Sequence, residues 1–173
     1  MVQKLKLALV IGTLLTCGTV KAEEMTSHGS HVHGEATLTF VLDGNEAEIA
    51  LVSAAGNIVG FEHKPKNAQE QQQLEQQLQM LRSGSWFQLG AEAGCTVTSH
   101  EVRSEQQDDH NHGHADIYAN LQLLCQQPER ISALDLTLLQ QVDGLEKVKL
   151  QWLVDGTAGT AELKPAAAKA TLR

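Results

Sequence analysis

The chain has 173 residues, 13 of them basic and 21 acidic, which gives a formal net charge of −8 at pH 7. This length suits one compact domain with its own hydrophobic core. An acidic surface repels nucleic acids and anionic membranes and attracts cations. The composition therefore argues against nucleic acid as a partner and favours a cation.

The N-terminus has the pattern of a secretory signal peptide. Two lysines precede the apolar run 7–15, which is too short to span a bilayer. The sequence "VKA" ending at Ala22 fits a small-x-small cleavage site, so we expect a signal peptide at 1–22 and a single compact domain at 23–173. The alternative is a lipoprotein anchored at Cys17, but a threonine precedes this cysteine instead of the usual small residue.

Cleavage would change both the charge and the cysteine count. The 13 basic residues fall to ten against 21 acidic ones, so the formal charge becomes −11. Only Cys95 and Cys125 remain, and in an oxidising compartment we expect them to form a disulfide worth roughly 3 to 4 kcal/mol. Two buried free cysteines are the alternative. No second apolar run of membrane-spanning length follows, so we expect no membrane insertion after cleavage.

The domain opens with two alternating stretches, "EATLTFVL" and "NEAEIAL", that predict a β-hairpin turning at Asp43-Gly44. The residues expected to face the core are Leu38, Phe40 and Leu42, then Ala47, Ile49 and Leu51. The period then changes, and Leu74, Leu78 and Leu81 predict one amphipathic helix over 67–84. Asn67 and Glu70 are placed as a capping box, and Gly84 as the helix end.

Next, "CTVTSHEV" and "ADIYANLQLLC" predict two paired strands joined by the polar, His-rich segment 104–114. The inward residues of the second strand are Ile117, Ala119, Leu121, Leu123 and Cys125. If these strands pair, the disulfide and the His-rich loop lie at opposite ends of the hairpin. His100 is expected to share a face with Thr96 and Thr98, as an exposed strand residue.

Three more stretches, "ALDLTLL", "KVKLQWLV" and "GTAELKP", predict further strands, with a turn at Asp155-Gly156. Their apolar faces are Leu134, Leu136 and Leu138, then Val148, Leu150, Trp152 and Val154. The fold class is therefore α+β, mainly antiparallel β-sheet with one amphipathic helix. His33 to Ala36 and His112 to Ala115 each lead into a strand, which raises the hypothesis of two related halves that each contain a β-hairpin.

Six of the eight histidines fall in two clusters, "SHGSHVHGEA" and "QQDDHNHGHAD". Imidazoles two residues apart can reach one metal ion when the backbone is extended or turned, and neighbouring carboxylates such as Glu24 and Glu35 add oxygen ligands and negative potential. His63, beside Glu62 where the chain is expected to leave a strand, is a candidate to complete the site of His31 and His33. The predicted metal ligands are His28, His31, His33, His63, His110, His112, His114, Asp108 and Asp109.

Zinc accepts this mixture of nitrogen and oxygen ligands. Copper(II) and nickel(II) stay acceptable, whereas copper(I) would want soft sulfur ligands and calcium would want more oxygens. The alternative interpretation is a solvated segment or a pH sensor whose imidazoles titrate near neutrality. There is no Gly-x-Ser-x-Gly or His-Glu-x-x-His motif, so we expect no enzyme activity, although a zinc site with Glu62 as base is conceivable.

Several stretches resemble the ZrgA-type family of bacterial periplasmic zinc-binding proteins: "HVHGEATLTFVLDGNEAEIALVSAAGNIVGFEHKPK", "HGHADIYANLQLLC" and "LEKVKLQWLVDGTAGTAELKP". The resemblance implies zinc binding in the periplasm and transfer of zinc to an ABC-type uptake system. It carries over the histidines of both clusters, with His63 matching the last residue of "GFEH". Both runs are short here, so the number of ions bound stays open.

Two classes of function follow. The first is a metal-binding protein, expected to be a monomer, that captures zinc and buffers it or delivers it to a zinc transporter. The second is a non-catalytic periplasmic interaction module, or transporter accessory, whose His clusters act as a pH or metal sensor. Loss of bound zinc from variants of the His-rich loop would favour the first.

Overall fold

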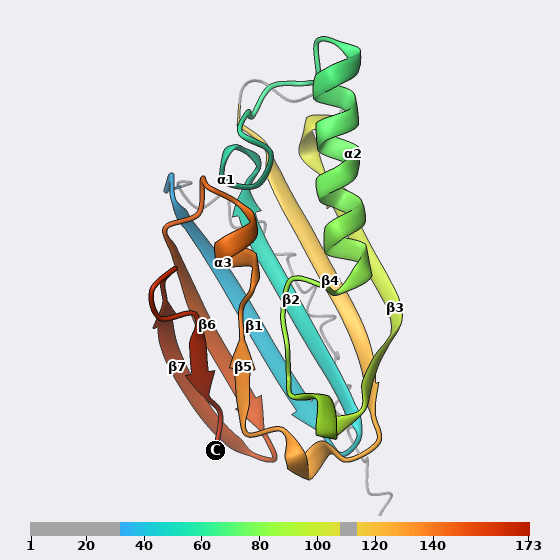
Figure 1. The fold of residues 1–173 in the computed structure, drawn as a ribbon, viewed down its shortest axis with the longest axis vertical. Helices are drawn as coiled ribbons and strands as arrows, with labels where there is room; N and C mark the ends of the chain where they lie inside the picture. Colours follow the sequence, from blue (N-terminus) through green and yellow to red (C-terminus); the bar gives the residue numbers. More distant parts are fainter. Residues whose placement is uncertain (1–31, 108–113) are drawn as a thin grey trace, which may run out of the picture.

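The computed structural model describes residues 32–107 and 114–173. A six-stranded sheet has the order β3-β4-β2-β1-β6-β7, and β5 pairs with β8 in a second, two-stranded sheet (Figure 1). The strands are β1 (Glu35–Asp43), β2 (Glu46–Ala54), β3 (Cys95–Ser104), β4 (Asp116–Cys125), β5 (Ala133–Asp135), β6 (Lys147–Val154), β7 (Thr157–Leu163) and β8 (Lys169–Thr171). The helices are α1 (Ala55–Val59), α2 (Ala68–Ser83) and α3 (Leu138–Gln141), with 3₁₀ turns at Ala91–Ala93, Glu105–Gln107 and Pro128–Arg130.

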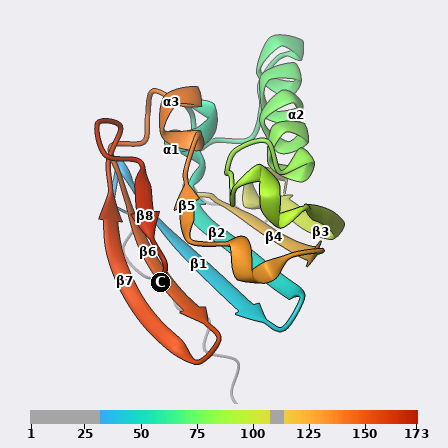
Figure 2. The same cartoon turned by 60° about the horizontal axis from the view of Figure 1, so that its bottom comes forward.

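The predicted α+β class is confirmed, with every neighbouring pair antiparallel except β1 and β6. The helices and the small sheet all cover the same face of the large sheet (Figures 1 and 2). The core lies between these layers and includes Leu38, Phe40, Ile49, Leu78 and Leu121, each at most 1% exposed. Among the described residues, the helices are too short or too polar for any of them to cross a membrane.

Helix α2 forms where its sequence predicts. The Asn67 side chain accepts a hydrogen bond from the Glu70 backbone N–H at 2.9 Å, which caps the first turn. Leu74, Leu78 and Leu81 are fully buried. The helix ends at Gly84, which has a φ of +70° and lies so close to the sheet that a Cβ would come within 2.9 Å of a Val97 methyl carbon.

The first hairpin has the predicted faces but a different turn. Asp43 pairs with Glu46, so the two turn residues are Gly44 and Asn45, one position later than predicted. Gly44 takes the positive φ that a II′ turn needs at its first residue, which suits glycine better than aspartate. The predicted turn at Asp155-Gly156 is confirmed, and both its residues have positive φ, as a type I′ turn requires.

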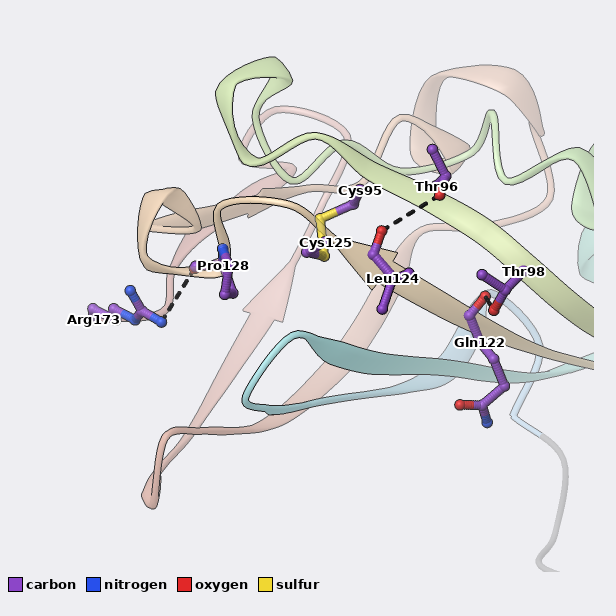
Figure 3. Close-up of a disulfide and its surroundings, with 8 residues drawn as sticks. All are labelled: Cys95, Thr96, Thr98, Gln122, Leu124, Cys125, Pro128 and Arg173. Carbon is purple, nitrogen blue, oxygen red and sulfur yellow. Dashed lines mark hydrogen bonds between the residues drawn. A yellow bond between two sulfur atoms is a disulfide. The ribbon is translucent and has the colours of Figure 1, made fainter.

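The second hairpin is confirmed together with its disulfide. Cys95 and Cys125 pair across β3 and β4 and are covalently joined, as Figure 3 shows. A β-bulge between Val97 and Ser99 shifts the register of β3. His100 therefore pairs with the buried Leu121, so it does not share the outward face of Thr96 as predicted, although it remains exposed.

Two further predictions are wrong in part. In "ALDLTLL" only Ala133–Asp135 forms a strand, and the chain then bends into α3, although Leu134, Leu136 and Leu138 are all buried as expected. The chain before His63 does not leave a strand directly, because α1 follows β2 without a gap. Short apolar runs with mixed spacing fit either a strand or one helical turn, and tertiary packing decides between them.

Candidate metal-binding site

The order of the strands brings one histidine from each predicted cluster to the same edge of the large sheet. Strands β1 and β4 lie on either side of β2, and both run antiparallel to it. They therefore run in the same direction and begin at the edge where β2 ends (Figure 1). His33 lies two residues before β1, and His114 two residues before β4.

The register places these two histidines at the same level. Ala36 and Ile117 both pair with Ser53, and each lies three residues after its histidine. Strands two positions apart are separated by roughly 10 Å, which two imidazole side chains can bridge through a shared partner. The similar stretches His33 to Ala36 and His112 to Ala115 match His33 with His112 in the sequence. In the sheet, His33 lies level with His114 instead.

Glu62 is the shared partner. Its chain segment follows α1, at the end of β2, between the two flanking strands. One carboxylate oxygen of Glu62 is 2.8 Å from His114 Nδ1, and the other is 3.8 Å from His33 Nδ1. The Glu62 side chain is only 14% exposed, against 77% for His33 and 73% for His114. A nearly buried carboxylate thus lies between two accessible imidazoles.

The Glu62 carboxylate packs against α1 at Gly56, where a Cβ would lie 3.2 Å from Oε1. Within the described part of the chain, no donor forms a hydrogen bond with this buried oxygen. A buried carboxylate oxygen without a donor is costly, and a bound cation would compensate for it. The orientation of Glu62 therefore suits a cation between Glu62 and His33.

The distances fit zinc in part. Two ligand atoms of a tetrahedral zinc ion lie roughly 3.3 Å apart when each is about 2 Å from the metal. The two distances from Glu62 to the imidazoles, 2.8 and 3.8 Å, lie on either side of this value. Over residues 32–107 and 114–173, however, no group of three His, Cys, Asp or Glu side chains has the arrangement of a metal site. The exposed imidazoles would have to turn toward Glu62 to bind one ion together.

Glu62 and His33 line a pocket, and two further carboxylates lie at it. His33, Asn57, Glu62, Asp143 and Glu146 are among the residues that line it. Asp143 and Glu146 come from the loop before β6, which starts at this edge because β6 runs parallel to β1. Neither is predicted as a site residue from the sequence, since nothing in "VDGLEKV" indicates that this loop lies beside His33.

Asn57 fixes the segment that carries His33. Its side-chain oxygen accepts a hydrogen bond from Gly34 N at 2.8 Å, and its amide nitrogen donates to Glu35 O at 2.9 Å and to Ser53 Oγ at 3.2 Å. The loop before β6 touches the same residue, because a Cβ on Gly144 would lie 2.7 Å from Asn57 O. The buried Asn57 therefore contacts the segment that carries His33, the end of β2 and the loop before β6.

Glu35 is not available as the oxygen ligand that its place near the first cluster suggested. Its carboxylate forms ion pairs with Lys147 and, at 2.7 Å, with Lys149. Hydrogen bonds from these two lysines hold the pKa of Glu35 below its ordinary value of 4.5. A cation would have to displace two lysines to bind there.

His63 has partners other than Glu62. Its ring stacks on Phe61, and its Nδ1 lies 3.0 Å from Lys64 O and 3.8 Å from a Glu70 carboxylate oxygen. Glu70 itself belongs to the first turn of α2. The other predicted ligands lie outside the described residues: His28, His31, Asp108, Asp109, His110 and His112. His33 and His114 are therefore the predicted ligands that the structure brings together.

Comparison with known proteins gives one family. A family model described as "ZrgA family zinc uptake protein" matches residues 30–172, which is most of the chain. A search of curated proteins finds no match. The matched region contains all the described strands and helices and every described residue of the candidate site.

Proposed function

Because the chain belongs to the ZrgA family of zinc uptake proteins, we propose that it captures zinc in the periplasm and buffers it or delivers it to an ABC-type zinc uptake system. The observation that carries this proposal is Glu62, a nearly buried carboxylate between His33 and His114. Carboxylate and imidazole are both common zinc ligands.

The site is suited to exchange rather than permanent storage. The carboxylate is held by the fold, whereas the two imidazoles are mostly exposed and can turn toward an ion or away from it. Asp143 and Glu146 add negative charge at the pocket, which raises the local concentration of cations. Bound zinc would thus remain accessible to a partner. We propose a binding role without catalysis, in a monomer.

The location and the partner are part of the proposal. The N-terminal pattern, which lies outside the described residues, favours export, and the disulfide between Cys95 and Cys125 suits an oxidising compartment. An ABC-type uptake system would take up the captured zinc, so a component of that transporter is the expected partner. Copper(II) and nickel(II) suit the same ligands and are the competing metals.

The test is calorimetric titration of the metal-stripped chain 23–173 with zinc at pH 7.5. We expect saturable binding at micromolar or lower concentration, weakened roughly tenfold or more by Glu62→Gln, since a metal–carboxylate bond is lost while the shape is kept. His100→Ala is the matched control, because this exposed histidine lies within β3, paired with Leu121 of β4, and is not a residue of the candidate site. Equal affinity of the Glu62→Gln variant and the wild type would contradict the proposed site.

The histidines of the second cluster need their own variant. His110→Ala combined with His112→Ala leaves the contact between His114 and Glu62 in place. If these side chains supply further ligands, zinc stoichiometry or affinity falls while circular dichroism stays unchanged. Unaltered binding would show that zinc capture needs neither His110 nor His112.

The contact between His114 and Glu62 also favours a second candidate function. This pair is an ion pair only when the imidazole is protonated, so the geometry suits a pH-responsive interaction module as well. Such a module would bind its partner with a proton-linked affinity that zinc and chelator leave unchanged. Saturable zinc binding that depends on Glu62 separates zinc capture from this alternative.

A further inference from the structure

Gln106 is completely buried, although it lies where β3 leads into the His-rich loop. It is the second residue of the 3₁₀ turn Glu105–Gln107. A buried carboxamide is costly unless its donors and its acceptor are all satisfied, so its partners show what it holds in place.

Both amide hydrogens of Gln106 go to the chain segment that carries Glu62. Nε2 donates to Phe61 O at 2.7 Å and to His63 O at 3.1 Å, which are the carbonyls on either side of Glu62. Its side-chain oxygen accepts from Ser104 Oγ at 3.2 Å. Gln106 therefore holds the backbone before and after Glu62 and is itself held by the end of β3.

The segment that Gln106 holds, residues 61–63, belongs to no helix or strand. Among the described residues, its backbone has no hydrogen bond to another backbone group, so side-chain contacts such as those of Gln106 position it. The turn of Gln106 is in turn fixed to β4, because Glu105 accepts hydrogen bonds from Asp116 N and the Tyr118 hydroxyl, both at 3.1 Å. Asp116 lies two residues after His114, so the same turn connects both sides of the contact between Glu62 and His114.

We propose that Gln106 is a positioning residue of the zinc site, which fixes the Glu62 carboxylate beside His114 by holding the two carbonyls that flank it. This inference rests on the proposed function and goes beyond it. A carboxamide suits the role because it donates two hydrogen bonds without bringing a positive charge near the metal, as lysine or arginine would. Residues that orient metal ligands typically affect metal affinity by roughly 10- to 100-fold.

The test is Gln106→Met, which keeps nearly the same shape and removes the two hydrogen bonds that the side chain donates, together with the one it accepts from Ser104. We expect zinc to bind at least about tenfold more weakly, with the fold retained. The matched control is Gln73→Met, because Gln73 Nε2 likewise donates to a backbone carbonyl, Val59 O at 2.7 Å, but does not flank Glu62. This control should lower the melting temperature and leave zinc affinity within about twofold of wild type.

The visible spectrum of bound cobalt(II) gives a readout that a loss of stability alone would not change, because its bands follow the ligand geometry. We expect altered bands for Gln106→Met and wild-type bands for Gln73→Met. If Gln106→Met does not fold, Gln106→Asn replaces it; its amide is one methylene too short to reach both carbonyls, and it should weaken zinc in the same way.

Zinc affinity and cobalt bands equal to those of Gln73→Met would overturn the role of Gln106 while the proposed function stands. No zinc binding by the wild type, or binding that ignores Glu62→Gln, would overturn the proposed function and this inference with it. The comparison of the two glutamine variants therefore separates the two failures.

Discussion

Tyr118 on β4, the only tyrosine of the chain, lies beside three charged side chains, Arg103, Glu105 and Asp116. Its hydroxyl donates to Glu105 Oε1 at 3.1 Å, and the Arg103 guanidinium lies 3.8 Å from the centre of its ring. Burial first, and then the negative charges of Glu105 and Asp116, raise the pKa of Tyr118 to about 12. Both effects disfavour the phenolate.

We therefore predict that Tyr118 titrates well above the ordinary tyrosine pKa of 10.0. Because the folded pKa is the higher one, its contribution to stability is complete below pH 10 and is lost as the pH rises from 10 toward 12. Ultraviolet absorbance of the phenolate measures this directly, with circular dichroism recorded in parallel. In denaturant the midpoint should fall to the ordinary value, and Glu105→Gln should lower it in the folded chain. A folded midpoint near 10 would contradict the described surroundings of Tyr118.

For single residues, the sequence predicts the types of side chain that form the site better than it predicts the individual residues. The spacing of the histidines points to His33 and His114 because imidazole is a common metal ligand wherever it occurs. Gln106 carries no such signal, and Glu62 is suggested by sequence only as a base beside His63, since the partners of Glu62 lie from 29 (His33) to 52 (His114) positions away in the chain. Only the pairing of the strands brings these neighbours together.

Asn57 acts at the level of elements, since it joins the entry of β1 to the end of β2 and to α1. We predict that Asn57→Ala lowers the free energy of unfolding by about 3 kcal/mol, because it leaves a buried N–H and a carbonyl without partners. Zinc should also bind more weakly, because Gly34 directly follows His33. Urea unfolding and calorimetry measure the two effects.

Asn120→Ala is the control for this variant. Asn120 is only partly buried, unlike Asn57, and it donates to the Glu48 carboxylate between β4 and β2. A smaller loss of stability with unchanged zinc affinity is expected. If both asparagine variants bind zinc like the wild type, Asn57 holds the fold together without positioning His33.

Elements with a strong local signal were predicted well, and those decided by packing were not. Helix α2 has a cap at Asn67, a regular apolar face and a terminal glycine, so its bounds follow from sequence. The bulge in β3 has no such signal, and it alone moves His100 to the other face. Helix α1 is only five residues long, too short for an apolar period to distinguish it from a continuing strand.

For the whole molecule, one feature of the topology gathers the site at one edge of the sheet. The parallel pairing of β1 with β6 is a long-range contact that has no signal in the sequence, and it brings the loop of Asp143 and Glu146 beside His33. Because β3 and β4 are antiparallel, the disulfide lies at the end of this hairpin that is opposite the candidate site. Stability and metal binding should thus be separable.

We predict that replacing Cys95 and Cys125 together by serine lowers the free energy of unfolding by about 3 to 4 kcal/mol, because the disulfide closes a loop with a sequence separation of 30 residues. Zinc affinity should stay unchanged, since the ten residues of β4 put roughly 30 Å between Cys125 and the start of that strand beside His114. Denaturant unfolding and calorimetry on the same preparation test both statements. A double variant that folds yet binds zinc markedly more weakly would show that the two ends of the hairpin are coupled, and that the disulfide maintains the geometry of Glu62 and His114 as well as the fold.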